Sequence, residues 1–396
     1  MTTSNIVMNS FKYNILFMKI CGLYPSEKYG KWFKFYAFLF YFVITLPAPL
    51  LPITHLVISR ETDMEKVAES MFVILVSGTV VLKFLPFKFN PDDIKRSIFA
   101  LNQDIFTRVF MDQEQYIRET EAACRKTFVS FMTCYLLSLF TWPIRVLIRP
   151  GRKFPIEIWL PFNPFERMDV YVTMFAYIVL ATGNAPVGNA SIETLIGGLI
   201  NHAACQIRIL KDTLQNLSRR VDEHIEKKVG IISATNKKKL KNYIVHREIC
   251  HCVKHYDAIY NFVRSVENTF AFVILNTFAV SCVVVCMTCF QLSLAEPFSA
   301  YFFAMVILII ALLLQIGIYC YYGTVLYEES DTINFAIYSS DWYNFDEKSK
   351  KALIILMERT KRPMLLMTGK ILDLSLTTWI MIIRRSYSLL AVLQNY

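Results

Sequence analysis

Residues 298–326 read FSAYFFAMVILIIALLLQIGIYCYYGTVL, and none of these 29 positions carries a charged side chain. A helix needs about 20 mostly apolar residues to cross the hydrocarbon core of a bilayer, so this stretch is long enough to span one. A second apolar run, residues 266–294, precedes it and is separated from it only by Ala295-Glu296-Pro297. Pro297 suits the first turn of a helix, because proline lacks the amide hydrogen that is unpaired there. The two runs therefore predict a hairpin of membrane-spanning helices.

The composition of the whole chain agrees with a membrane protein. Hydrophobic residues make up 55% of the 396 positions and charged residues 19%, and the mean hydropathy is +0.38. Soluble domains contain roughly 45–50% apolar and about 25% charged residues. Intrinsic disorder, a collagen-like chain and a small disulfide scaffold are excluded, and a polytopic membrane protein is the leading class.

Seven apolar runs are predicted to form transmembrane helices, and the basic residues between them orient the chain. The segments on the side of the amino terminus hold 31 Lys and Arg residues, and the alternate segments hold nine. Cytoplasmic loops carry the excess of basic residues, so we expect a cytoplasmic N-terminus and an extracellular C-terminus. The predicted fold is all-α, and the expected spans are 32–58, 67–85, 127–148, 168–200, 266–294, 298–326 and 369–394.

Two polar segments between spans have apolar residues at helical spacing. In residues 201–265 these include Ile207, Leu210 and Leu214, and residues 346–362 form a further amphipathic pattern that ends at Pro363. Such helices cannot bury their apolar stripes alone, so we expect a cytosolic helical anchor bundle that suits subunit association. The predicted organisation is 1–31 cytosolic, 32–200 the first four spans, 201–265 anchor helices, 266–326 spans five and six, 327–368 an anchor segment, and 369–396 the last span and tail.

Residue patterns for catalysis or metal binding are weak. The sequence has no glycine-rich phosphate loop, nucleophile elbow or HExxH motif, which disfavours an enzyme. One cluster of His and Cys residues suggests a metal site. Its members lie on two helical faces that diverge by about 140°, so they cannot form a local tetrahedral set of ligands, and we expect neither metal nor cofactor. This cluster of possible metal ligands is His246, Cys250, His251, Cys252 and His255.

We also expect no nucleic-acid partner, because the basic run 237–241 lies in a cytosolic loop.

Carboxylates are scarce within the predicted spans. Glu193, Glu267, Glu296 and Asp373 lie at or near predicted span ends. A proton relay or an ion-coupled transporter usually needs such groups at mid-depth, so both are disfavoured.

The last span carries an unusual polar stripe. Arg384 and Arg385 lie well inside an apolar run, where a lipid-facing charge costs roughly 2.5–3.5 kcal/mol on insertion scales. At about 100° per residue, Arg384, Tyr387, Ala391 and Gln394 fall within about 80° of arc. Such a stripe could border an aqueous pore. Alternatively, the embedded part ends earlier and the arginines extend to the headgroups.

Aromatic residues and methionines gather in the outer halves of spans two to six. A dry pocket of this composition would bind a small volatile or lipid-like molecule mainly by apolar burial, with tyrosine hydroxyls adding direction. The competing interpretation is ordinary packing between helices. The candidate ligand contacts are Phe72, Val76, Tyr135, Leu139, Trp142, Tyr171, Met174, Phe175, Ile178, Tyr301 and Met305.

Short motifs at residues 160–162 (LPF), 336–342 (AIYSSDW), 361–363 (KRP) and 385–390 (RSYSLL) follow one another in an order and spacing that resemble the insect odorant receptors over nearly the whole chain. Leu160-Pro161-Phe162 resembles the stretch before span four of that family. Residues 336–342, AIYSSDW, followed by Lys361-Arg362-Pro363, resemble its segment after span six. Residues 385–390, RSYSLL, are similar to its terminal signature.

This resemblance implies a subunit of a ligand-gated, non-selective cation channel in the plasma membrane of olfactory sensory neurons. It implies a tuning subunit that binds a small apolar odorant, lies in membrane lipid and forms a heterotetramer with an odorant co-receptor subunit through cytosolic anchor helices. It also implies that the last span lines the pore, with Gln394 similar to a pore-mouth glutamine and Ala391 at the position of a hydrophobic gate. Because alanine is small, a tuning subunit is favoured over a homomeric channel.

Two other functions stay open at the level of sequence. A seven-span G-protein-coupled chemoreceptor would place the amino terminus outside, contrary to the distribution of basic residues. A gustatory-type homomeric channel shares the implied fold, but here six residues separate Tyr387 from Gln394, one more than the spacing in that subfamily.

Overall fold

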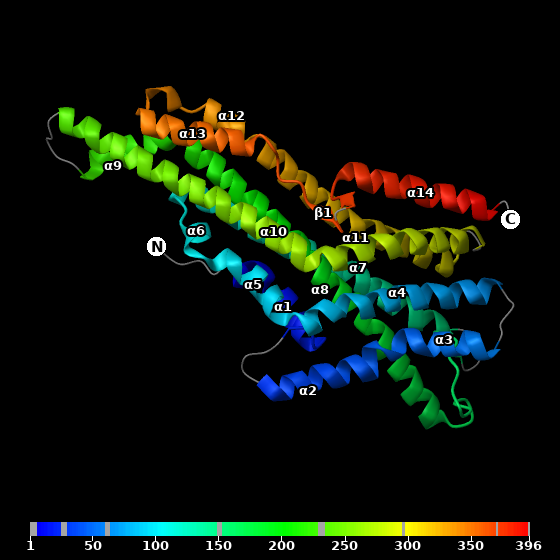
Figure 1. Ribbon diagram of the computed structural model, residues 1–396. Helices are drawn as coiled ribbons and strands as arrows, with labels where there is room; N and C mark the ends of the chain where they lie inside the picture. The colour runs from blue at the N-terminus through cyan, green and yellow to red at the C-terminus, as the bar shows by residue number, and fades with distance from the viewer. Residues whose placement is uncertain are drawn as a thin grey trace.

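A computed structural model describes residues 6–24, 30–59, 64–148, 153–228, 234–294, 298–369 and 371–394. Most helices run roughly along one long axis, with α9, α12 and α13 toward one end and α14 toward the other (Figure 1). The helical elements in chain order are α1 (Ile6–Ile20), α2 (Gly30–Phe40), η2 (Tyr41–Thr45), α3 (Pro47–Ser59), α4 (Met64–Phe89), α5 (Pro91–Phe99), η3 (Ala100–Asn102), α6 (Asp104–Thr107), η4 (Met111–Gln113), α7 (Glu114–Ile148), α8 (Met168–Gln215), α9 (Leu217–Lys228), α10 (Ala234–Leu294), α11 (Ala300–Asp331), α12 (Ile333–Tyr338), η5 (Trp342–Asn344), α13 (Glu347–Thr360) and α14 (Leu376–Gln394). The predicted all-α class is confirmed, and the strands are limited to the two-residue pair β1 (Met367–Thr368) and β2 (Leu372–Asp373) within the described residues.

The long helices account for the seven predicted spans. Among the described residues, five helical stretches are apolar and long enough to cross a membrane, namely Gly30–Ser59, Ser70–Phe89, Met168–Gln215, Lys237–Cys289 and Met305–Tyr338. The third and the seventh predicted spans are formed by α7 and α14. The sixth span is predicted to begin at Phe298, and α11 begins at Ala300, where Ser299 caps it by accepting a 3.1 Å hydrogen bond from the amide of Phe302. The expected role of Pro297 in its first turn lies outside the described residues.

The first span is not a regular α-helix, because three prolines follow its middle. Pro47 has no amide hydrogen for the carbonyl of Val43, and the helix widens into the π-turn η2 just before it. The hydroxyl of Tyr177, on α8, donates a 2.7 Å hydrogen bond to that Val43 carbonyl. Thr45 accepts a further hydrogen bond of 2.8 Å from the side chain of Asn184. The irregularity therefore attaches the first span to α8.

The segment before the first span is part of the core and not a simple tail. Helix α1 buries Ile6, Phe11 and Met18 against α7 and α8. Helices α1 and α8 approach each other closely, because a Cβ atom added to Gly198 of α8 would lie 2.5 Å from the ring of Phe11 on α1. Sequence reasoning missed this helix, although its apolar residues recur at helical spacing.

Helices continue from the membrane region into a bundle at one end of the molecule. Helices α8 and α10 run through the predicted boundaries at residues 200 and 266 without a break, and they pack with α9, α12 and α13 (Figure 1). On the predicted amphipathic helix α13, Leu353 and Leu356 are buried. Arg220 forms ion pairs of 2.7 Å with Asp112 and 2.5 Å with Asp212. Burial opposes ionisation of Asp112, but the hydrogen bond and the charge of Arg220 outweigh it and lower the pKa of this carboxyl.

The last span begins later than the sequence suggests. The expected helix start at Gly369 is wrong, because Met367–Thr368 pairs with Leu372–Asp373 as antiparallel strands, and Gly369, which follows the first strand, has a φ of 59°. The chain then passes so close to α11 that a Cβ on Gly323 would lie 2.2 Å from the carbonyl oxygen of Leu374. Helix α14 starts at Leu376 and packs on α10 and α11.

Candidate functional site

Three of the predicted ligand contacts meet around Phe72 in the outer half of the membrane region. Phe72 packs against one apolar cluster with Ile178 of α8 and against a second with Val76 and residues of α10 and α11. The first cluster also includes Phe154, Ile156 and Ile158 from the connection before α8, and the second includes Val284, Val285, Cys289, Leu308 and Leu312. Five parts of the fold thus supply one apolar layer, which we call the outer layer.

Other predicted contacts lie near this layer and partly serve the architecture. Tyr171 stacks on Phe154 with ring centroids 5.5 Å apart, contacts Phe175, and donates a 3.0 Å hydrogen bond to the carbonyl of Lys153. These contacts attach α8 to the connection that precedes it. Met174 is half-buried, Met305 is buried, and Leu139 lies 3.2 Å from the Cβ position of Gly183.

The predicted contact Tyr135 belongs to a polar network deeper in the bundle. The Tyr135 hydroxyl donates a 3.2 Å hydrogen bond to Oε1 of Gln315, and Nε2 of Gln315 donates one of 2.8 Å to Glu193. Lys83 forms an ion pair with the same carboxylate and donates a 3.1 Å hydrogen bond to Oδ1 of Asn189. We call these five residues, from α4, α7, α8 and α11, the inner network.

The inner network holds two charges completely away from solvent. The side chains of Lys83 and Glu193 are both 0% exposed. An isolated buried charge is very unfavourable, whereas a close ion pair with additional hydrogen bonds is tolerated. Sequence reasoning placed Glu193 near a span end and missed this pair. A useful signal was present, because Lys83 also stands near the end of an apolar run and needs a partner of opposite charge.

The remaining predicted residues are placed only in part. Trp142 lies on α7 and Tyr301 on α11, but their side chains are outside the described part of the structure, as are those of Tyr387, Ala391 and Gln394 on α14. Arg384 is exposed. These positions are therefore located on their helices without side-chain contacts.

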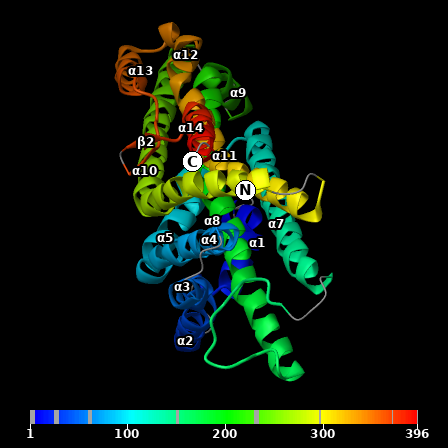
Figure 2. The same cartoon turned by 90° about the vertical axis from the view of Figure 1, so that its right-hand side faces the viewer.

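Helix α14 has a covered face and an uncovered face. The indole nitrogen of Trp379 donates a 3.1 Å hydrogen bond to the carbonyl of Leu313, and Ser386 is buried near Cys282. Figure 2 shows α14 beside α10 and α11 and away from α2 and α3. On the other face, Ile380 is 48% exposed, and both Arg384 and Arg385 are exposed. Within the described part of this single chain, these side chains lack an intramolecular cover.

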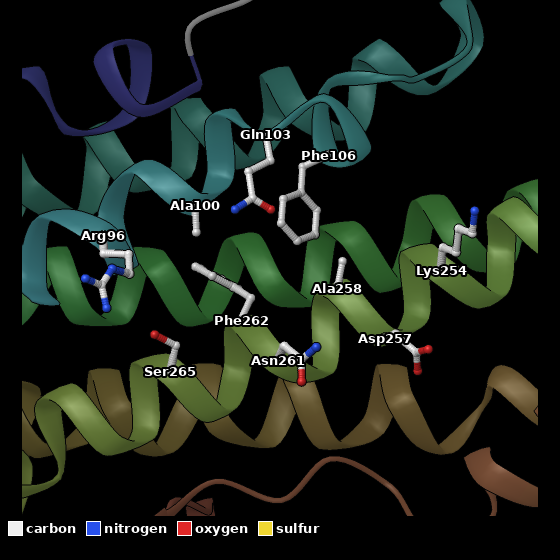
Figure 3. Close-up of a pocket in the computed structure, with 10 residues that line it drawn as sticks. All are labelled: Arg96, Ala100, Gln103, Phe106, Lys254, Asp257, Ala258, Asn261, Phe262 and Ser265. Carbon is white, nitrogen blue, oxygen red and sulfur yellow. The ribbon is translucent and has the colours of Figure 1, made fainter.

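A separate cleft lies closer to the cytosolic bundle (Figure 3). It has a volume of about 480 Å³ and lies between α10 and the α5–α6 region. Arg96 and Lys254 stand toward its two ends, and Phe106 and Phe262 supply apolar wall. Among the side chains that the structure describes, none of the predicted ligand contacts lines this cleft.

The fold and the site define a class of protein. It is an all-α, multi-pass membrane protein with seven membrane-spanning helices, an apolar layer between the outer halves of several spans, and a helical bundle at the opposite end. Residues 63–387 match the family model described as 7tm Odorant receptor. The chain therefore belongs to the 7tm odorant receptor family, and the resemblance of its motifs is confirmed.

Individual relatives agree with this assignment. Odorant receptor Or1 of Anopheles gambiae is 22% identical, with 98% of this chain and 95% of the relative covered. Odorant receptor 33a of Drosophila melanogaster is 24% identical, with 77% of each chain covered. The insect olfactory receptor OR5 of Machilis hrabei in complex with eugenol has the same fold, with a TM-score of 0.81 at 15% identity over 97% of each chain.

Proposed function

We propose that the chain is a ligand-tuning subunit of an odorant-gated, non-selective cation channel. In this proposal it assembles with an odorant co-receptor subunit as a heterotetramer in the plasma membrane of olfactory sensory neurons. Membership in the odorant receptor family supports the receptor role and disfavours a G-protein-coupled or gustatory-type alternative. The solved relative in complex with eugenol supports a small organic ligand.

The convergence of Phe72, Val76 and Ile178 carries the ligand-binding part of the proposal. An odorant binds mainly by burying its apolar surface, which is worth about 25 cal/mol per Å². A layer formed by several helices gives such a molecule contacts that change when the helices move relative to one another. Differential contacts of this kind are what a ligand needs to shift a closed channel toward an open one.

The uncovered face of α14 supports the pore part of the proposal. Arg384 and Arg385 are exposed on a helix that otherwise has the composition of a membrane span. Facing lipid would cost each of them several kcal/mol, so water or neighbouring subunits are the favourable surroundings. We assign the pore-lining positions to Arg384, Tyr387, Ala391 and Gln394, with Ala391 at the gate.

Exposed apolar residues on the cytosolic bundle support assembly with other subunits. Phe335 and Tyr338 on α12 and Ile355 on α13 are 68%, 69% and 69% exposed. These side chains lie outside the predicted spans, where water makes such exposure unfavourable. Large exposed apolar side chains on two helices in contact are typical of an interface. We therefore assign it to contacts with the co-receptor subunit.

The ligand-binding part is tested by recording odorant-evoked currents from the chain expressed with the co-receptor. Phe72→Ala and Ile178→Ala remove apolar contacts from the outer layer and are expected to raise the EC50 of active odorants about tenfold or more. Leu180→Ala is the matched control, because Leu180 is 56% exposed on the same helix as Ile178. Surface labelling checks that all variants reach the membrane. Equal EC50 values for the three variants and the wild type would refute the proposed site.

The pore part has its own test. Gln394→Arg is expected to shift the reversal potential of the odorant-evoked current under biionic conditions, because it adds a positive charge at the proposed pore mouth. Gln394→Asn keeps a neutral amide and is expected to preserve the wild-type value. Unchanged permeability in Gln394→Arg would remove this residue from the ion pathway.

A further inference from the structure

One buried glutamine in the outer half of the bundle has an amide group without hydrogen-bond partners among the described residues. Gln291 on α10 is 2% exposed. Among the residues that the structure describes, neither its Nε2 nor its Oε1 has a hydrogen-bond partner. A buried amide without partners is unfavourable, because it gives up hydrogen bonds to water and receives none in return. Its presence calls for a polar group that completes the site.

Other buried polar side chains at comparable positions are engaged. Gln315 both donates and accepts a hydrogen bond within the inner network. Thr288, one turn before Gln291, donates 2.7 Å to the carbonyl of Val284, and Ser77 donates to the carbonyl of Val73. Gln291 thus differs from its neighbours in having both ends of its amide unpaired within the described part of the chain.

Helix geometry places Gln291 at the outer layer. Val284, Thr288 and Gln291 are spaced i, i+4 and i+7, so they lie on one face of α10. Val284 is a buried member of the cluster that contains Phe72 and Val76. Gln291 follows about 10 Å further along the same face, at a rise of about 1.5 Å per residue.

The antiparallel partner helix supports the same placement. Cys289 of α10 and Leu308 of α11 belong to that same cluster. Because the two helices run in opposite directions, Gln291 lies about 3 Å outward of Cys289 and Met305 lies about 4.5 Å outward of Leu308 along their helix axes. Met305 is buried and is one of the proposed ligand contacts.

We propose that Gln291 is the polar contact of the ligand site and that it selects odorants carrying one neutral oxygen group. This inference rests on the proposed ligand-binding function. The amide nitrogen donates to a ligand hydroxyl or carbonyl oxygen, and the amide oxygen accepts from a ligand hydroxyl. An alcohol therefore pairs both ends of the amide and a ketone pairs its nitrogen, whereas a hydrocarbon of the same length leaves both ends unpaired. The apolar outer layer holds the rest of the ligand.

The test compares matched probes on the wild type and on Gln291→Met, each expressed with the co-receptor. Methionine has the length and unbranched shape of glutamine but no amide. The probes are straight-chain alcohols, methyl ketones and alkanes of equal chain length. The EC50 values are first corrected for the different concentrations of the probes in water. After this correction, the EC50 of the alkane for the wild type is expected to exceed that of the alcohol about tenfold. This factor is the upper range for one neutral hydrogen bond. In Gln291→Met this preference is lost, because alcohol sensitivity falls and alkane sensitivity is kept or improved.

Gln315→Met is the matched control, because it removes a buried amide that is paired at both ends. It is expected to lower surface expression and the response to every probe together, without changing their ratio. Gln291→Met is expected to reach the surface at the wild-type level or above, because it removes an unpaired group.

Two results would overturn the inference while leaving the proposed function intact. One is an unchanged preference between alcohol and alkane in Gln291→Met. The other is a parallel loss of surface level and of all responses in that variant, which would show that Gln291 is structural. If no probe or broader odorant panel opens the wild-type channel while the co-receptor responds to its own agonist, the proposed function itself is refuted and this inference with it.

Discussion

The inner network and the outer layer share helices α4, α8 and α11 but are built in different ways. Within the inner network, Lys83 and Glu193 are fully buried and Gln315 is bonded at both ends of its amide. In the outer layer, Phe72 and Val76 are only partly buried and make apolar contacts. Hydrogen bonds and ion pairs require defined geometry, whereas apolar contacts are non-directional. The bundle therefore has a fixed inner half and a more adaptable outer half.

Glycines show the same contrast in packing. A Cβ on Gly188 would lie 2.4 Å from the ring of Phe84, and one on Gly197 would lie 2.9 Å from Ile318. At the outer position Gly183 the nearest atoms are side-chain carbons of Leu139 at 3.2 Å. The inner half therefore depends on close approach of its helices, while the outer half leaves more room for adjustment.

The largest expected effect comes from breaking the buried ion pair. Lys83→Met leaves the Glu193 carboxylate without its counter-ion and is expected to cost about 3–5 kcal/mol of stability. Thermal unfolding of the detergent-purified protein measures this loss. The double variant Lys83→Met with Glu193→Met removes both charges and is expected to recover much of it. A single variant as stable as the wild type would show that the inner network is not a fixed scaffold.

A smaller effect is expected from adding one methyl group at matched glycines of α8. Gly188→Ala forces the new Cβ against Phe84, which is 1% exposed, and is expected to cost about 1–3 kcal/mol. In Gly183→Ala a small shift of Leu139 suffices, and the gain in helix propensity of about 1 kcal/mol offsets the strain. The melting temperatures of the two variants in one detergent provide the measurement. Equal destabilisation would remove the distinction between the two halves.

The smallest effect concerns two tyrosine hydroxyls. Tyr135→Phe leaves the buried Oε1 of Gln315 without its donor and is expected to cost about 1 kcal/mol. Tyr171→Phe frees a carbonyl of Lys153, an exposed residue at which water replaces the hydroxyl, so the change is expected to stay within about 0.5 kcal/mol. Thermal unfolding again ranks the pair. A larger loss in Tyr171→Phe than in Tyr135→Phe would contradict the contrast between a fixed inner half and an adaptable outer half.

The sequence predicts the membrane helices well because their signal is local. Apolar runs of sufficient length and the distribution of basic residues require no knowledge of tertiary contacts. The continuation of α8 and α10 into the anchor bundle also follows from helical periodicity. The start of α14 does not, because Met367–Thr368 pairs with Leu372–Asp373 beside α10, and the helix begins only at Leu376.

The site is less predictable because it depends on pairing between distant residues. Phe72 and Ile178 were recognised from their residue types, and packing places both in one layer. Lys83 and Glu193 are 110 positions apart, and nothing local to either residue indicates the other. Gln291 looks like one more polar residue near a helix end until its burial and its lack of partners among the described residues are known.

The most direct measurement is a cryo-EM map of the chain assembled with the co-receptor and bound to an active odorant. We predict ligand density within the outer layer, between Phe72, Ile178 and Met305, with the inner network unchanged from the ligand-free assembly. Density in the cleft lined by Arg96 and Lys254, with none in the outer layer, would contradict the proposed ligand site.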